Sequence, residues 1–128
     1  MTTAPTPRRR QSKEHSEQTR FVMKVRAFHP AVLCFAVPNG ASVSAAQRLR
    51  LTHEGMMSGA PDLMLFFAGL PPLAVEMKTD TGKASKEQLS MHQALRDRGI
   101  VVRLCRSAEE AYSAMTEWLN INHATDSK

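Results

Sequence analysis

Two short apolar segments joined by a loop of Gly and Pro constrain the fold of this chain most strongly. The segments are residues 62–67 and 73–78, and the loop between them is residues 69–72. Such a pattern is typical of an antiparallel hairpin. A hairpin turns the chain back on itself, so we expect Asp62, at the start of the first strand, to lie near Glu76 and Lys78 at the end of the second.

The chain before the hairpin predicts a helix, a strand and a second helix. The first helix runs from Ser12 to about Phe28, and the apolar run 31–37 predicts a buried strand. The second helix is capped by Ser42 or Ser44 and ends near Glu54, before Gly55. The residues expected on the inner sides of these two helices are Phe21, Val22, Val25, Phe28, Ala46, Leu49 and His53.

The chain after the hairpin predicts a helix, a strand and a last helix. Ser85 and Gln88 form a capping-box pattern, Gly99 closes that helix, and residues 100–105 are strand-like. A helix starting at Ser107 follows, with Ala111, Met115, Trp118 and Leu119 facing the core. The strand after the Ser85 helix can return parallel to the Glu76 strand. We therefore expect an α/β fold in which helices flank a mixed sheet with Glu76 near its middle.

The net charge of +5 is concentrated at the start of the chain. Arg8, Arg9, Arg10 and Lys13 leave 13 basic and 12 acidic residues from Glu14 onward. Residues 1–11 lack apolar periodicity, so we expect a basic arm there, a single domain over 12–120 and a frayed tail over 121–128. The arm either contacts phosphates or is a solvated segment.

The composition argues against several classes of protein. No apolar run approaches the length of a membrane span, and the basic start is not followed by the apolar block of a secretory signal. Cys34 and Cys105 lie in apolar runs without zinc-ligand spacing, which predicts buried reduced thiols. We expect a cytoplasmic protein that does not bind membranes.

Glu76 is flanked by apolar residues, where a glutamate costs stability unless it is paired or ligated. On a strand, Ala74, Glu76 and Lys78 share one face, and the residues between them face the core. Two carboxylates at close range repel unless a cation separates them, and oxygen ligands favour Mg²⁺ or Mn²⁺. With Lys78 beside them, Asp62 and Glu76 suit hydrolysis of a phosphodiester. The alternative is a Glu76–Lys78 ion pair on a half-exposed sheet face.

Spacing alone does not separate these alternatives, because Asp126-Ser127-Lys128 has the same acid-x-Lys pattern in a polar tail. The start of the Ser85 helix favours the phosphodiester site over the ion pair, since the free N–H groups of a helix start can bind a phosphate. His92 falls on the same helix beside apolar residues, and we expect a partly buried residue rather than a base.

Several motifs together resemble the virus-type replication-repair nuclease (VRR-NUC) domain of the PD-(D/E)XK superfamily. They occur in the order Val37-Pro38-Asn39-Gly40, Gly55 and Gly59, Pro61-Asp62-Leu63, Val75-Glu76-Met77-Lys78, Gly82-Lys83-Ala84-Ser85 with Gln88, and Arg98-Gly99. The resemblance spans roughly residues 17–119. It implies a restriction-endonuclease-like core, in agreement with the order of elements predicted above.

The resemblance also implies roles for individual residues. Asp62 and Glu76 would bind the metal with the Met77 carbonyl, and Lys78 and Gln88 would be catalytic. Glu17 resembles the acidic residue of the family's first helix, with Glu14 as the alternative. DNA contacts would come from Asn39, Gly40, Arg48, Ser85 and Lys86, with Arg50 and Lys83 as further candidates.

At the level of function, the resemblance implies a Mg²⁺- or Mn²⁺-dependent DNA endonuclease without an organic cofactor. Small members of the family suggest a homodimer that cuts branched DNA such as four-way junctions, in a bacterial cell or a phage-infected host. The alternatives are a nucleic-acid-binding protein that keeps the fold without cleaving, and a structural partner that binds neither DNA nor metal.

Overall fold

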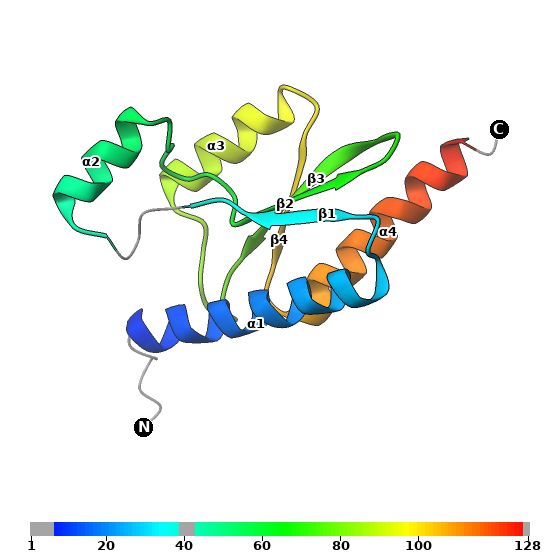
Figure 1. The fold of residues 1–128 in the computed structure, drawn as a ribbon, viewed down its shortest axis with the longest axis horizontal. Coiled ribbons are helices and arrows are strands. Elements are labelled where there is room, and N and C mark those ends of the chain that lie inside the picture. The colour runs from blue at the N-terminus through cyan, green and yellow to red at the C-terminus, as the bar shows by residue number, and fades with distance from the viewer. Residues whose placement is uncertain (1–6, 39–42, 127–128) are drawn as a thin grey trace.

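The computed structural model describes residues 7–38 and 43–126, and its helices and strands follow the predicted order (Figure 1). The elements are α1 (Pro7–Phe28), β1 (Leu33–Ala36), α2 (Ala45–His53), β2 (Leu63–Phe67), β3 (Leu70–Met77), α3 (Lys86–Arg96), β4 (Val101–Cys105) and α4 (Ala108–Asp126). None of the helices in these ranges is long and apolar enough to cross a membrane.

The four strands form one mixed sheet in the order β1-β2-β3-β4. β1 pairs antiparallel with β2, β2 pairs antiparallel with β3, and β4 returns parallel to β3. The predicted hairpin and the predicted parallel return are both confirmed. Glu76, paired with Leu104, therefore lies on an inner strand.

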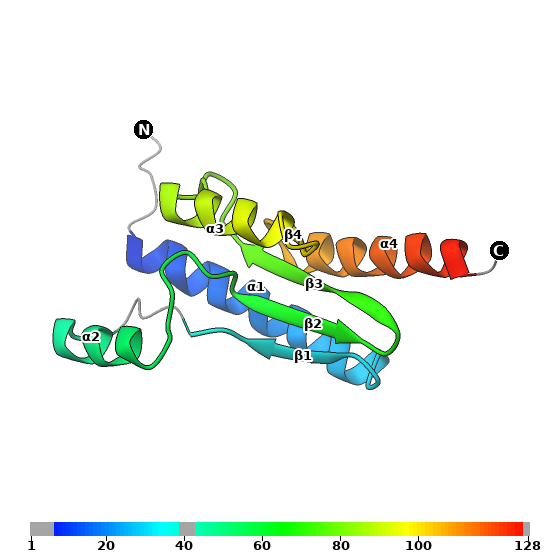
Figure 2. The ribbon, with the colours of Figure 1, turned by 90° about the horizontal axis from the view of Figure 1, so that it is seen from above.

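Helices cover the sheet unequally on its two faces (Figures 1 and 2). α1 and α4 pack against each other and against one face, and α3 packs over β4 on the other. The main core lies between the sheet and the α1–α4 pair, where apolar burial is the chief source of stability. Its buried members are Phe21, Val25, Cys34, Leu63, Leu65, Leu73, Val75, Met77, Cys105, Ala108, Ala111, Ala114 and Met115. Both cysteines are free and buried, as predicted.

The long helices extend beyond their predicted ends. α1 begins at Pro7 rather than Ser12, so residues 7–11 are helical and the predicted arm is wrong over that range. Proline is favoured at the first helical position, and the Arg, Gln, Lys and Glu residues that follow are good helix formers. At the other end of the chain, α4 continues to Asp126, although we expected fraying after Asn120.

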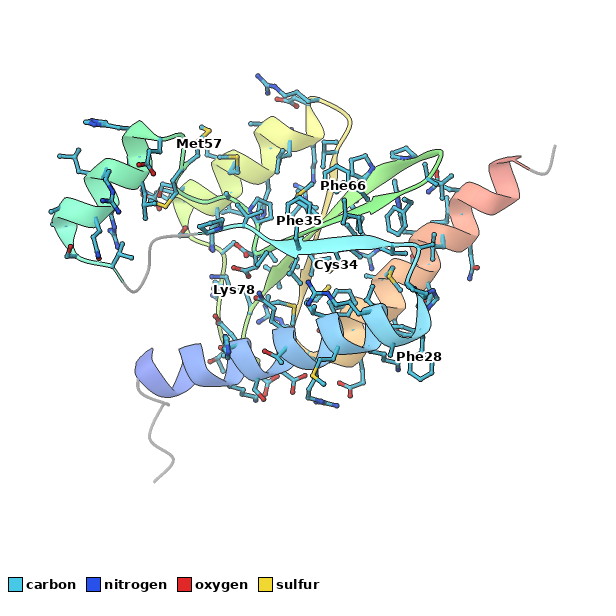
Figure 3. All side chains as sticks on the ribbon, viewed as in Figure 1. Phe28, Cys34, Phe35, Met57, Phe66 and Lys78 are labelled. Carbon is cyan, nitrogen blue, oxygen red and sulfur yellow. The ribbon has the colours of Figure 1, made fainter. Side chains whose placement is uncertain are left out.

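The predicted inner faces are correct for α4 and only partly correct for α1. In α4, Ala111 and Met115 are fully buried, and Trp118 and Leu119 pack against the core. In α1, Phe21 and Val25 are buried and Val22 is half-buried, but Phe28 is 70% exposed. Phe28 is the last residue of the helix, and its side chain points away from the sheet (Figure 3).

β1 is an edge strand, and the prediction of a buried strand over 31–37 is wrong. Only Cys34 in β1 is buried, whereas Leu33 and Phe35 are exposed. Phe35 stacks on Phe66 of β2, with ring centroids 5.7 Å apart, on the face opposite Cys34 (Figure 3). α3 covers that face only over the β4 side, so the apolar residues of β1 stay at the surface.

α2 forms where expected but stands apart from the rest of the fold (Figure 2). Ser44 caps it and the chain leaves through Glu54 and Gly55, whose φ is +113°. The other candidate cap, Ser42, is outside the described residues. The predicted inner side is wrong: Ala46 and His53 are exposed, and Leu49 is 59% exposed. The backbone of α2 packs against no other described helix or strand.

Candidate active site

Asp62 is held where the β2–β3 hairpin brings its two free ends together. Its Oδ2 accepts a hydrogen bond from the Met77 N–H at 2.7 Å, and its own carbonyl accepts one from Val37 N–H at 2.8 Å. The N–H and C=O of one strand residue project to the same side, so the Met77 carbonyl also faces Asp62. The predicted proximity of Asp62 to the end of β3 is confirmed.

Glu76 is fully buried in the middle of the sheet, because α3 covers the face on which its side chain lies and α1 and α4 cover the opposite face. The half-exposed sheet face of the ion-pair alternative is therefore wrong, because the structure encloses the carboxyl group. Neither carboxylate oxygen has a hydrogen-bond partner among the described residues. Burial, then the neighbouring Asp62 carboxyl, raises the pKa of Glu76 to about 9, while the Lys78 ammonium opposes the rise. The carboxyl therefore keeps its proton at neutral pH unless a cation takes its place.

His92 lies against Glu76 from the facing helix α3. Its side chain is buried, and its Nε2 is 3.9 Å from Glu76 Oε1 and lacks a hydrogen-bond partner in the described parts of the chain. Burial, followed by the charges of Arg96 and Lys78, lowers the pKa of His92, so the imidazole is neutral at neutral pH. The sequence predicted a partly buried helix residue here, and nothing in it indicated the pairing with Glu76.

Lys78 follows β3 at the same end of the sheet (Figure 3). Its backbone N–H donates to the Cys105 carbonyl at 2.9 Å, which fixes its position next to β4. The loop after it is held by Arg106, whose guanidinium donates to the carbonyls of Thr79 and Gly82 at 2.5 and 2.8 Å. Arg106 thus supports the loop that follows Lys78, a role that no motif in the sequence indicated.

A groove of about 360 Å³ opens beside Asp62. Its lining includes Asp62, Ser85 and Gln88, together with Arg48 and Thr52 of α2. The capping box is present as predicted: Gln88 N–H donates to Ser85 Oγ at 3.2 Å, and Ser85 N–H donates to Gln88 Oε1 at 2.8 Å.

Gly59 brings the loop before Asp62 against the first turn of α3. Its φ is +85°, and a Cβ at this position would lie 2.3 Å from the Glu87 carbonyl oxygen. Lys86 is exposed in the same turn and does not line the groove. Asn39 and Gly40, predicted to contact DNA, lie outside the described residues.

Comparison with known proteins identifies the family. A family model described as the VRR-NUC domain matches residues 9–109, most of the chain. The chain belongs to the VRR-NUC family. The Pro61-Asp62 and Glu76-Met77-Lys78 segments, on which the resemblance rested, lie within the matched residues.

Solved structures agree with the restriction-endonuclease-like fold of a VRR-NUC chain. One described as a VRR_NUC domain protein has a TM-score of 0.68 and 15% identity, over 84% of this chain and 88% of its own. Another, described as a VRR_NUC domain, has a TM-score of 0.61 and 23% identity, over 83% and 97%. No curated protein matches the sequence significantly.

The VRR-NUC domain has two candidate acids on its first helix, and the structure separates them. Glu14 Oε1 accepts a hydrogen bond from Thr79 N–H at 3.2 Å, directly after Lys78. Glu17 is engaged elsewhere: it binds Arg20 at 3.0 Å and accepts from Ala108 N–H at 2.7 Å, at the start of α4. Glu14 is therefore the helix acid next to the end of β3, and Glu17 connects α1 to α4.

The donors at the VRR-NUC site fit a hard divalent cation. Oδ1 of Asp62 takes no part in the bond to Met77, and the two Glu76 oxygens have no hydrogen-bond partner in the described residues. By strand geometry, the Met77 carbonyl projects to the side on which Asp62 lies. No cluster of three or more His, Cys, Asp or Glu side chains with metal-binding geometry occurs within 7–38 and 43–126. A cation would thus have two carboxylates, one carbonyl, and water or substrate oxygens, a set that suits Mg²⁺ or Mn²⁺.

Proposed function

We propose that this VRR-NUC chain is a Mg²⁺- or Mn²⁺-dependent endodeoxyribonuclease that hydrolyses phosphodiester bonds. The observation that carries the proposal is the fully buried Glu76 carboxyl, unpartnered among the described residues and set beside Asp62. Such a group is costly in a chain that needs only to fold. A divalent cation would relieve that cost by binding both carboxylates.

Asp62, Glu76 and the Met77 carbonyl would hold the cation at the free end of the hairpin. The bound ion would polarise the scissile phosphate and acidify a water molecule. Lys78 stabilises negative charge on the phosphate or orients the attacking water, and the Arg106-bound loop keeps its backbone in place. Glu14 and Gln88 border the site from α1 and α3 and can position water or substrate oxygens.

DNA would approach through the groove beside α3. The first N–H groups of α3 and the positive end of its dipole favour a phosphate there. Ser85 and Lys86 belong to this helix start, and Arg48 lines the groove from α2. Asn39 and Gly40 complete the predicted DNA-binding set on the basis of the resemblance alone.

We further propose a homodimer that prefers branched DNA such as four-way junctions, in the cytoplasm of a bacterial or phage-infected cell. Two equivalent sites related by symmetry suit paired cuts in two strands. The exposed apolar residues Leu33, Phe35 and Phe66 are the kind of surface that a second copy covers. Sedimentation equilibrium should give twice the 14.2 kDa of one chain, and a mass near 14.2 kDa would contradict the dimer.

The test of the enzyme is cleavage of linear, nicked, flapped and four-way DNA in Mg²⁺, Mn²⁺ or EDTA. We expect cleavage only with a cation, and a loss of about 100- to 1,000-fold in Glu76→Gln and Lys78→Met. Glu117→Gln serves as a control, because Glu117 is exposed on α4 and pairs with Arg103. Equal cleavage by wild type and Glu76→Gln would exclude the proposed chemistry. DNA binding without cleavage on any substrate would favour the non-catalytic alternative.

A further inference from the structure

Three buried polar atoms without partners gather on the α3 side of β3. They are the two carboxylate oxygens of Glu76 and Nε2 of His92, in the described part of the chain. Glu76 comes from an inner strand and His92 from the helix packed over it, and both side chains are almost completely buried. Because buried polar atoms are normally hydrogen-bonded, this cluster indicates an interaction that is completed in another state of the site.

We infer that His92 positions Glu76 for cation binding, by donating a hydrogen bond from Nε2 to the Glu76 carboxylate. The inference rests on the proposed metal-dependent function. His92 would not touch the cation or the DNA, so it is a positioning residue rather than a catalytic one. Its effect would be to hold one carboxylate oxygen so that the other points to Asp62 and the cation.

The geometry requires only a small adjustment. Nε2 and Oε1 are 3.9 Å apart, and a shift of roughly 1 Å brings them to hydrogen-bond distance. The chemistry of the two groups is complementary. A carboxylate accepts hydrogen bonds at both oxygens, and an imidazole with its hydrogen on Nε2 supplies the missing donor.

The position of His92 on α3 connects this contact to the substrate groove. Gln88, one turn earlier on the same helix, lines the groove together with Ser85. The capping box and the close approach of Gly59 fix the start of α3, so His92 is supported by a rigid element. Supporting groups of this kind orient metal ligands, and their loss commonly weakens metal affinity by about 10- to 100-fold.

Two substitutions of similar length separate hydrogen bonding from packing. His92→Gln keeps an N–H donor near the position of Nε2, whereas His92→Met fills the space without a donor. Ser90→Met is the control, because Ser90 is exposed on α3 and receives the same side chain. Mn²⁺ binding is measured by electron paramagnetic resonance and by calorimetry, without DNA and without an activity assay.

We expect His92→Met to raise the Kd for Mn²⁺ about 10- to 100-fold, and His92→Gln and Ser90→Met to stay close to wild type. The rise in melting temperature on adding Mn²⁺ is measured on the same proteins, since this shift reports metal affinity even if the baseline stability changes. Without metal, His92→Met should melt no lower than wild type, because it removes an unpaired polar atom.

Each contrary result has a distinct meaning. Wild-type protein that binds no Mn²⁺ would overturn the proposed function, and this inference with it. If wild type binds Mn²⁺ and His92→Met binds it with the same Kd, the inference is overturned and the proposed function is not. Equal weakening in His92→Gln and His92→Met would also overturn it, since packing rather than hydrogen bonding would then explain the effect.

Discussion

The carboxyl of Glu76 binds a proton more tightly in the folded chain than in the unfolded chain, because its pKa rises from 4.5 to about 9. Between these values the folded state keeps a proton that the unfolded state has lost. The stability contributed by the protonated group is therefore complete below pH 4.5 and is lost as the pH rises to about 9.

In EDTA, we expect this component of the free energy of unfolding to disappear in Glu76→Gln. Urea denaturation across that pH window should show wild type losing stability relative to Glu76→Gln as the pH rises. Glu117→Gln, a change at an exposed carboxyl, should follow wild type. Adding Mn²⁺ should reverse the trend for wild type, because metal binding requires the ionised carboxylate. Parallel curves for wild type and Glu76→Gln would show that Glu76 titrates normally.

Gly59 allows a comparison of backbone strain with steric contact. Gly59 and Gly69 have similar positive φ values, +85° and +76°, but only at Gly59 would an added Cβ meet backbone, that of α3. Both alanine substitutions should cost about 1–2 kcal/mol from the left-handed conformation. Gly59→Ala should cost more and weaken DNA binding, because the first turn of α3 must move. If urea denaturation gave equal losses in the free energy of unfolding for the two variants, the first turn of α3 would move aside at little cost.

Single residues also show where sequence reasoning reaches its limit. Glu14 and Glu17 are three positions apart on one helix and so share a face. The sequence narrowed the helix acid to this pair and favoured Glu17, with Glu14 as the alternative. Only tertiary contacts show which acid lies near the end of β3. Glu14 accepts a hydrogen bond from Thr79, whereas Glu17 accepts one from Ala108 at the start of α4. His92 was missed as a partner of Glu76 because no local pattern connects a helix residue to the strand beneath it.

Among the elements, α2 and α3 begin with the same capping box in different surroundings. Ser44 caps α2, whose backbone packs on no other described element, and Ser85 caps α3, which packs on β4. Ser85→Ala should therefore lower the global free energy of unfolding by about 1 kcal/mol. Ser44→Ala should leave it unchanged and only speed amide hydrogen exchange within α2. Equal global losses would show that α2 folds together with the core.

The errors at the element level have a common physical cause. An apolar run reveals that a segment prefers burial, but not whether the sheet continues beyond it, so β1 was expected inside and lies at the edge. Apolar periodicity reveals a helix only where one of its faces is buried. The first turns of α1 have no such apolar face, and they were therefore missed in the sequence. The hairpin and the parallel return of β4 were predictable because turn residues and chain connectivity leave few alternatives.

For the molecule as a whole, the charge distribution sets how DNA binding should respond to salt. Arg8, Arg9 and Arg10 lie in the first turns of α1, near the chain start that carries most of the net charge. Replacing all three with Gln should reduce the slope of log K against log salt by about 0.9 for each arginine that contacts a phosphate. Fluorescence anisotropy with labelled DNA at several salt concentrations measures this slope.

A matched triple variant provides the control. Lys24, Arg26 and Arg98 are exposed and lie away from the start of α1, so changing them to Gln removes the same charge elsewhere. The slope should change less in this variant. Identical slopes in the two triple variants would indicate that only the net charge matters, in agreement with a solvated basic segment.

The separation of α2 from every other described helix and strand has a consequence for how such a nuclease can diversify. Residues 43–58 can change in sequence without disturbing the sheet or the two carboxylates, since other parts of the chain hold these in place. Yet Arg48 and Thr52 of this segment line the groove beside Asp62. Changes in this segment would therefore alter the lining of the groove while leaving the hairpin and its two carboxylates in place.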